Sequence, residues 1–157
     1  MSRGEKRAAA RLAAVQALYQ MDVAKTGINE IFAEFESHWI GQEVEGEQYK
    51  PAEVAFFRAT VEGVMAGQGE IDRLIDNALQ EDWPLRRVEA VLRATLRAGT
   101  YELIGRKDIP VRVTIKEYTD VAGAFLEGDE VGMVNAVLDG LARRLRPSEM
   151  AGLARSG

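Results

Sequence analysis

The chain has 157 residues, of which 46% are hydrophobic and 29% charged, so it is long and apolar enough for one folded domain with its own core. It contains no cysteine, which excludes disulfides, thiolate metal sites and a cysteine nucleophile, and no uncharged apolar run approaches the roughly 18 residues that span a bilayer. We therefore expect a cytoplasmic protein that makes no membrane contact, and its net charge of −5 argues, taken alone, against a nucleic-acid partner.

Hydrophobic residues recur at three- and four-residue spacing through nearly the whole chain, which is the pattern of amphipathic helices. A first helix is predicted over about residues 5–24. Six more are predicted, in chain order, around residues 28–39, 54–65, 71–79, 85–103, 115–125 and 129–145.

The four prolines support these boundaries. Pro51, Pro84 and Pro110 stand where the third, fifth and sixth helices open, and Pro147 stands where the seventh closes. Proline suits the first turn of a helix or the position just past its end, because it has no N–H and its ring blocks the preceding turn.

No segment alternates apolar and polar residues over enough positions to predict a strand. The acidic segment 41–50 is predicted to be the longest loop, and the small and polar residues 148–157 a flexible tail. The predicted fold is all-α, with one domain over residues 1–147 and about seven helices in two packed helical sub-bundles.

Patterns that carry catalysis or bind metals are missing from the sequence. The chain has one histidine, His38, and it lacks a Gly-x-Ser-x-Gly elbow, a His-Glu-x-x-His pair and a Walker loop. A lone histidine without cysteines is far more often a surface or packing residue than a zinc ligand. We therefore predict a protein that is not an enzyme and that needs no metal and no cofactor.

The charges are distributed unevenly along the chain. Residues 26–82 carry three basic and thirteen acidic side chains, whereas residues 1–25 carry five basic and two acidic ones and residues 83–126 carry eight and five. Residues 1–25 and residues 83–126 therefore each have a net charge of +3. A polyanion can dock on these two segments if they meet in space. The alternative is that the N-terminal basic residues only form the solvated face of a helix.

The first predicted helix combines basic and aromatic residues. Arg7 and Arg11 are four residues apart and share a face, and Tyr19 lies close to that face. Cations neutralise phosphates and a ring stacks on an exposed base, so this combination favours single-stranded nucleic acid. Tyr19 also fits the apolar stripe of the same helix, so a packing role is the alternative.

Four stretches, in this order and at these spacings, resemble the NusB family: "AVQALYQMD" (14–22), "FFRATVEGV" (56–64), "LRAGTYELIGRKDIPVRVTIKE" (96–117) and "MVNAVLDGL" (133–141). The resemblance covers about residues 5–146. It implies an all-helical transcription antitermination factor that pairs with NusE, a small-subunit ribosomal protein. The pair would bind the single-stranded boxA element of nascent ribosomal RNA and, with other Nus factors, help RNA polymerase to resist Rho-dependent termination. Some members of the family form homodimers that hide the RNA surface.

The resemblance also implies roles for individual residues. RNA contacts are expected in the first helix, in the fifth and at the start of the last, from Lys6, Arg7, Arg11, Gln16, Tyr19, Arg97, Asp129 and Met133. Partner contacts are expected from Leu92, Tyr101 and Glu102. Asn135 stands beside an apolar stripe, where a buried amide costs free energy unless it finds partners. We expect it to be structural and to satisfy polar groups across a helix crossing.

The sequence departs from the family pattern at several of these places. The alanines at 8–10 replace basic residues, Met133 replaces a phenylalanine and offers no ring to stack on, and Leu92 replaces an acidic residue. The sequence "KEY" (116–118) replaces the family's common Asn-Glu-Ala. These departures put the strength of base contact and the charge complementarity to NusE in question.

Three hypotheses follow. The first is an antitermination factor that binds RNA with NusE, and it predicts that the basic start of the first helix converges in space with Asp129 and Met133. A homodimeric or partner-binding helical scaffold with weak intrinsic RNA affinity is the alternative, and the acidic segment and the alanines at 8–10 favour it. A helical domain of the kind attached to some RNA methyltransferases is disfavoured, because the chain has no room for a catalytic domain and no cofactor motif.

Overall fold

The computed structural model describes residues 3–41, 51–79 and 88–156, and within these ranges it contains seven α-helices and no strand. The predicted all-α fold is therefore confirmed. The helices are α1 (Arg3–Ala24), α2 (Ile28–Gly41), α3 (Pro51–Ala78), α4 (Ala90–Gly105), α5 (Val111–Phe125), α6 (Gly128–Leu145) and α7 (Pro147–Ser156). The predicted loop at 41–50 and the predicted helix opening at Pro84 fall almost entirely outside the described residues.

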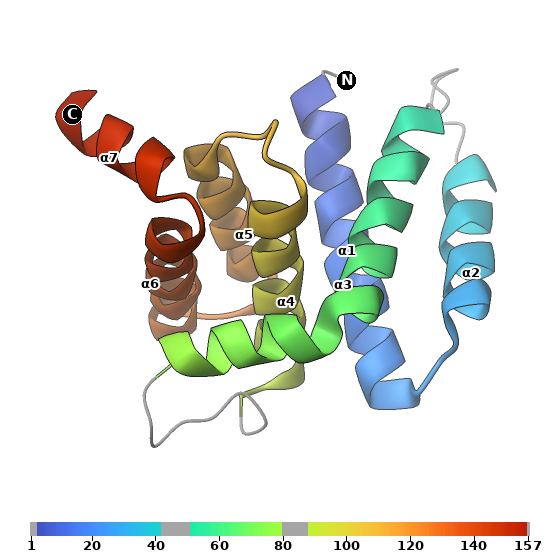
Figure 1. Ribbon diagram of the computed structural model, residues 1–157. Coiled ribbons are helices and arrows are strands. Elements are labelled where there is room, and N and C mark those ends of the chain that lie inside the picture. The colour runs from blue at the N-terminus through green and yellow to red at the C-terminus, as the bar shows by residue number, and fades with distance from the viewer. Residues whose placement is uncertain (1–2, 42–50, 80–87, 157) are drawn as a thin grey trace.

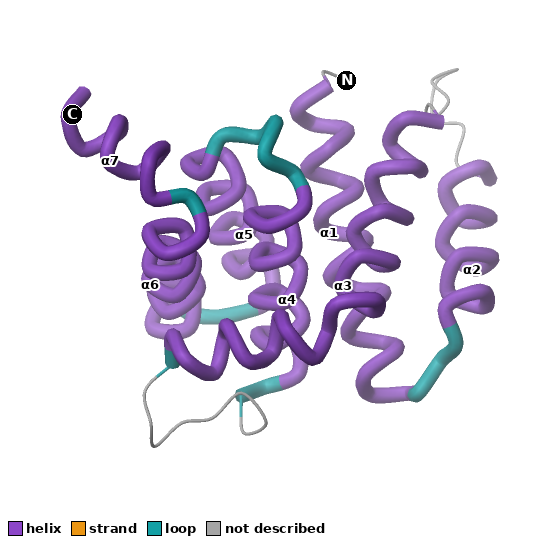
Figure 2. Tube along the Cα trace, in the orientation of Figure 1, coloured by secondary structure: helices purple, strands orange, loops and turns teal. Residues whose placement is uncertain are grey.

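The helices form two groups that share α4 as their centre (Figure 1). The first group contains α1, α2 and the first half of α3, and the second contains α4, α5 and α6. α4 packs against α1 and α3 on one side and against α5 and α6 on the other. Short loops join α4 to α5 and α5 to α6, which makes these neighbours antiparallel (Figure 2).

The core follows the apolar stripes of the sequence. Leu92, Leu96 and Leu103 of α4 are fully buried, and Leu138 and Leu141 of α6 pack in the same cluster. Because the stripes recur every three or four residues, each helix turns one continuous face inward. Among the described helices, none is long and apolar enough to cross a membrane.

The predicted third and fourth helices are both present, and they meet at a kink at Gly67 inside the segment labelled α3. Gly67 has φ −111° and ψ 18°, which are not helical angles, so the chain changes direction there. The first half of α3 packs against α1, and the second half runs across the base of the molecule to α6 (Figure 1). The two helices predicted on either side of Gly67 are therefore confirmed.

Residues 147–156 form α7, where the sequence predicted a flexible tail. Pro147 ends α6 and at the same time opens α7, because the first helical position tolerates a residue without an N–H. Met150 and Leu153 are partly buried against the core, and their three-residue spacing was the helical signal in this short segment.

Candidate nucleic-acid interface

The basic start of α1 meets a second basic segment at one end of the molecule. The guanidinium of Arg7 lies 5.1 Å from the centroid of the Phe56 ring, and that of Arg106 lies 5.0 Å from the same ring. Arg106 belongs to the connector between α4 and α5, residues 106–110. Phe56 thus holds cations from α1 and from the connector around one aromatic ring.

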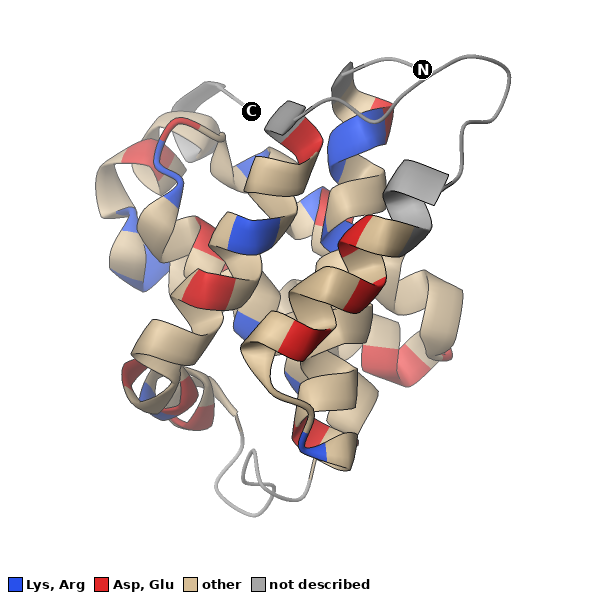
Figure 3. Cartoon of the chain, turned by 90° about the vertical axis from the view of Figure 1, so that its right-hand side faces the viewer, with Lys and Arg blue, Asp and Glu red and all other residues tan. Residues whose placement is uncertain are grey.

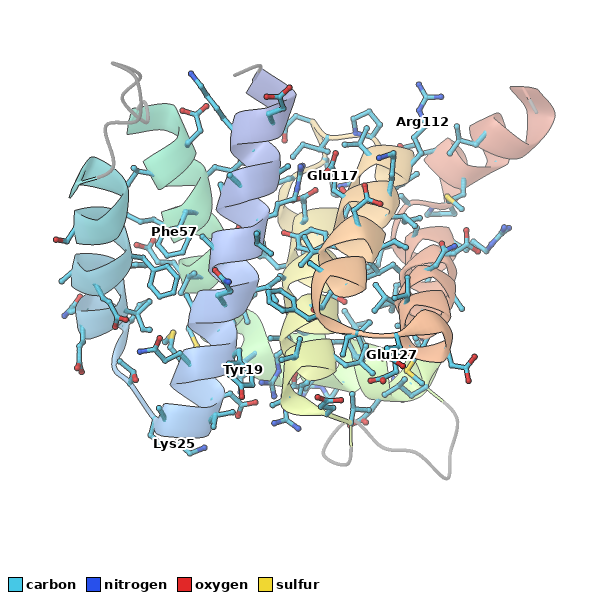
Figure 4. All side chains as sticks on the ribbon, turned by 180° about the vertical axis from the view of Figure 1, so that it is seen from behind. Tyr19, Lys25, Phe57, Arg112, Glu117 and Glu127 are labelled. Carbon is cyan, nitrogen blue, oxygen red and sulfur yellow. The ribbon has the colours of Figure 1, made fainter. Side chains whose placement is uncertain are left out.

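We call the cations at this end the basic edge. Its members, which are exposed or half-buried, are Lys6, Arg7, Arg106, Lys107 and Arg112. Figure 1 shows the start of α1 and the connector at the same end, and Figure 4 places Arg112 there as well. The side chain of Asp108 hydrogen-bonds Arg106 at 3.1 Å, and this bond lowers the pKa of Asp108. The basic edge therefore joins the two segments that the charge distribution singled out.

The structure corrects the prediction that Arg11 contacts RNA. Only 2% of this residue is exposed, because it points from α1 toward α4 instead of toward solvent. Its Nε donates to Oε1 of Glu102 at 2.9 Å and its Nη2 to Oε2 at 3.2 Å. Burial alone lowers the pKa of Arg11, but the hydrogen bonds and charge of Glu102 outweigh it, so the pKa is raised. Arg11 is a buried cation whose charge is already neutralised.

The structure also corrects the prediction that Glu102 contacts a partner, because only 1% of this residue is exposed. Besides Arg11, it accepts hydrogen bonds from the hydroxyls of Thr114 at 2.6 Å and Tyr118 at 3.4 Å. Tyr118 is the tyrosine of the "KEY" departure, and its ring is fully buried. These residues form a satisfied polar network between α1, α4 and α5, and such networks are stabilising only when complete.

The other residues of α4 that were predicted as RNA or partner contacts also pack against, or bond to, other parts of the fold. Leu92 is fully buried, so its assignment as a partner contact is wrong. Arg97 donates to Asp72 at 2.8 and 2.9 Å and lies 3.6 Å from Asp22, so it links α4 to α3 and α1. Tyr101 is half-buried, and its ring covers Gly63 so closely that a Cβ there would clash with it.

Gln16 and Tyr19 lie farther along α1 and are exposed, with 39% of Tyr19 accessible. With Gln20, Glu34 and Phe35 they line a groove of about 730 Å³ between α1 and α2. The tyrosine ring is therefore available for stacking. Because α1 rises ~1.5 Å per residue, Tyr19 lies ~18 Å along the helix from Arg7.

The start of α6 lies at the opposite end from the basic edge. Asp129 is exposed there and Met133 is half-buried against the core. Figure 4 shows the neighbouring Glu127 at the end of the molecule near Tyr19, whereas Arg112 is at the other end. The basic start of α1 therefore does not converge with Asp129 and Met133, and it converges with the connector instead.

Asn135, predicted to be structural and buried, is exposed. The buried stripe of α6 runs through Val134, Val137 and Leu138, and one residue step turns the helix by about 100°, which carries position 135 out of that stripe. Asn135 lines a groove of about 390 Å³ between α5, α6 and α7. It therefore satisfies no polar group across a buried helix crossing.

The face of the molecule on the α2 side has the opposite charge. Figure 3 looks onto this side and marks positions of acidic residues along α2, whose sequence contains Glu30, Glu34 and Glu36. Arg58 of α3 pairs with Glu36, and the hydrogen bond lowers the pKa of Glu36. A polyanion is repelled from this face and attracted to the basic edge.

Comparison with known proteins identifies the family. The model of the NusB family matches residues 8–143, which is most of the chain. The chain belongs to the NusB family. Two relatives named transcription antitermination protein NusB are 62% identical over 149 residues (Nitrobacter hamburgensis) and 65% identical over 147 residues (Rhodopseudomonas palustris). The alignments cover 95% and 94% of this chain, and 93% and 87% of the relatives.

Solved structures agree with the family assignment. NusB of T. maritima superposes with a TM-score of 0.78 at 30% identity, over 92% of this chain and 96% of that one. A complex described as antitermination factors NusB and NusE with double-stranded RNA superposes with a TM-score of 0.74 at 24% identity, over 92% and 99% of the two chains, and shows the fold. NusB proteins are transcription antitermination factors, a non-enzymatic family.

Sequence reasoning missed three members of the basic edge, Arg106, Lys107 and Arg112. The signal was present in the second basic segment and in the "GRKDIPVR" part (105–112) of the family stretch. In the first helix the cations and the ring occur together in the sequence, whereas Arg106 is brought beside the ring of Phe56 only by the fold.

Proposed function

We propose that this NusB-family protein is a cytoplasmic transcription antitermination factor that binds single-stranded boxA RNA together with NusE. With other Nus factors it helps RNA polymerase to resist Rho-dependent termination. The observation that carries the RNA-binding part is the basic edge, where Phe56 gathers Arg7 and Arg106 from segments that are far apart in the sequence.

The basic edge supplies the phosphate contacts in this proposal. Lys6 and Arg7 face the same end of the molecule as Arg106 and Lys107, and cations at this density bind a polyanion without reading its sequence. Tyr19 and Gln16, one after the other along the exposed face of α1, contact bases. A ring stacks on a base and an amide hydrogen-bonds to its edge.

Two predicted RNA contacts, Asp129 and Met133, fit a longer path. They belong to the start of α6, which lies toward the same end of the molecule as the end of α1 (Figure 1), so an RNA strand that follows α1 from the basic edge runs toward that end. Met133 then contributes an apolar contact without stacking. NusE covers a surface of the α4–α6 half in this arrangement, with the half-buried Tyr101 as the one predicted partner residue that is not fully buried.

The test is a titration of a labelled boxA RNA with the protein, alone and with NusE, against a scrambled RNA at several salt concentrations. We expect specific binding that tightens with NusE and weakens with salt. Equal affinity for both RNAs, even with NusE, would overturn the proposal. The protein would then be a homodimeric or partner-binding scaffold, which sedimentation at the same concentrations would detect.

A further inference from the structure

Arg146, the residue between α6 and α7, is buried and directs its guanidinium at the end of α4. It donates to four backbone carbonyls, two in the last turn of α4 and two in the connector. The distances are 3.2 Å to Glu102, 2.9 Å to Leu103, 2.7 Å to Arg106 and 2.6 Å to Ile109. The last carbonyls of a helix have no partner within it, so Arg146 caps α4 and continues into the connector.

Glu149, in the first turn of α7, holds the other end of the connector. Its Oε2 accepts the backbone N–H of Val111 at 2.7 Å, and Val111 is the first residue of α5. Its Oε1 lies 3.3 Å from Nη1 of Arg146. One carboxylate therefore caps α5 and also orients the arginine that caps α4, so that all five N–H groups of the guanidinium have an acceptor.

The connector between these two caps carries part of the basic edge. Ile109 is buried and anchors its middle, while Lys107 is exposed and Arg106 lies over Phe56. A loop that is already held in its binding conformation loses less conformational entropy when it meets a ligand. The caps thus affect how tightly the connector's cations bind RNA, although neither Arg146 nor Glu149 belongs to the basic edge.

We propose that Arg146 and Glu149 are positioning residues for RNA binding, and that α7 serves to hold the connector in its RNA-binding conformation. This proposal rests on the proposed function. It assigns a role to the C-terminal helix, which contributes no residue to the basic edge.

The sign of the effect separates this role from simple electrostatics. Glu149 is acidic and lies near a basic edge, so removing its charge alone tightens the binding of a polyanion. Loss of the cap loosens the connector and weakens binding. Glu149→Ala is therefore expected to weaken boxA binding about fivefold in the presence of NusE. The matched control is Asp139→Ala, which removes the same charge from an exposed pair with Arg143 on α6 and leaves binding unchanged or slightly tighter.

Two further measurements test whether Glu149→Ala changes RNA binding through the connector. Amide hydrogen exchange of residues 106–111 should be faster in Glu149→Ala and unchanged in Asp139→Ala. In a background that carries Arg106→Gln and Lys107→Gln, Glu149→Ala should have little further effect on RNA affinity. The connector then has no cations left to position, so the two changes are not additive.

The outcomes distinguish this proposal from the one on which it rests. If the wild-type protein shows no preference for boxA, the proposed function fails first. If it does, and folded Glu149→Ala binds as tightly as Asp139→Ala, the positioning role is overturned and the proposed function stands. Should Glu149→Ala lose its helical circular dichroism, Glu149→Gln replaces it and Asp139→Asn is its control. Equal binding of those two would also overturn the role.

Discussion

Arg7 and Arg11 stand one helical turn apart on α1, yet their surroundings differ. Both lie over the ring of Phe56, but Arg7 is half-buried at the basic edge, whereas Arg11 is enclosed with Glu102, which comes 91 residues later in the chain. The residue type and the spacing on the helix predicted the same role for both. The partner across the helix interface makes Arg11 part of a buried ion pair, and the helical period of α1 does not contain that information.

The salt dependence of RNA binding separates these two arginines. Arg7→Ala should lower the slope of log affinity against log salt by about 0.7, the value for one lost phosphate contact on a single strand. Arg11→Ala should leave the slope unchanged, because Arg11 is not accessible to a phosphate. Arg73→Ala, at an exposed position on the second half of α3, is the charge-matched control and should also leave it unchanged. A reduced slope in Arg11→Ala would contradict the structure.

Arg11→Ala should instead affect the stability of the fold. It leaves the buried carboxylate of Glu102 without its cation, and breaking a buried pair in this way costs about 3–5 kcal/mol. Urea unfolding followed by circular dichroism measures this. Arg11→Met with Glu102→Leu, which removes both charges, should recover much of the loss, and a double variant no better than Arg11→Ala would argue against the pair as the cause.

Because Tyr118 is buried, we expect the folded protein to lose stability at alkaline pH. Burial, followed by the negative charge of Glu102, raises its pKa well above the ordinary value. The unfolded chain therefore releases this proton at a lower pH than the folded protein does. The contribution of Tyr118 is complete below a pH of about 10, the ordinary tyrosine pKa, and is lost as the pH rises above it. Melting temperatures across this range should fall less steeply in Tyr118→Phe, and equal slopes would refute the assignment.

Among the elements, α1 to α6 followed from apolar periodicity, because each has a buried stripe whose spacing is set by the helix itself. The error lies at the C-terminus, where residues 148–157 were predicted to be a flexible tail and residues 147–156 form α7. That helix depends on its packing against the rest of the fold, through Arg146 and Glu149 at the α4–α5 connector, and no local pattern records this neighbour.

Two glycines of α3 give a test at this scale. Gly63→Ala should destabilise the fold by about 1–3 kcal/mol, because the added methyl group meets the ring of Tyr101 and forces α3 and α4 apart. Gly67→Ala should be tolerated, since its Cβ would lie 3.7 Å from Cδ1 of Ile71 and the backbone angles suit alanine. The measurement is the midpoint of urea unfolding for both variants. Equal losses would mean that Tyr101 does not set the helix distance.

For the whole molecule, the net charge of −5 describes neither the acidic face on the α2 side nor the basic edge. Acidic residues are concentrated in α2 and α3, and the basic edge lies where α1 meets the connector (Figure 1). The division of charge along the chain therefore indicated that two basic segments could meet in space, but it did not indicate which residues meet. The family resemblance supplied the first-helix residues, and the connector became evident only when the fold placed it beside Phe56.

The acidic face should influence RNA association through long-range repulsion. Glu30→Gln combined with Glu70→Gln removes two exposed negative charges far from the basic edge. Association should be faster at low salt and unchanged near physiological salt, where charges are screened beyond about 8 Å. Stopped-flow association at several salt concentrations tests this. An acceleration that persists at high salt would place these residues at the RNA contact itself.

The bent α3 has a consequence for how the protein unfolds. The segment Pro51–Ala78 packs against α1 before the kink at Gly67 and against α6 after it, and α4 lies between (Figure 1). Neither helical group can come apart without exposing apolar surface of the other. Heat and denaturant should therefore melt both groups in a single cooperative transition, with no populated state in which one half stays folded alone.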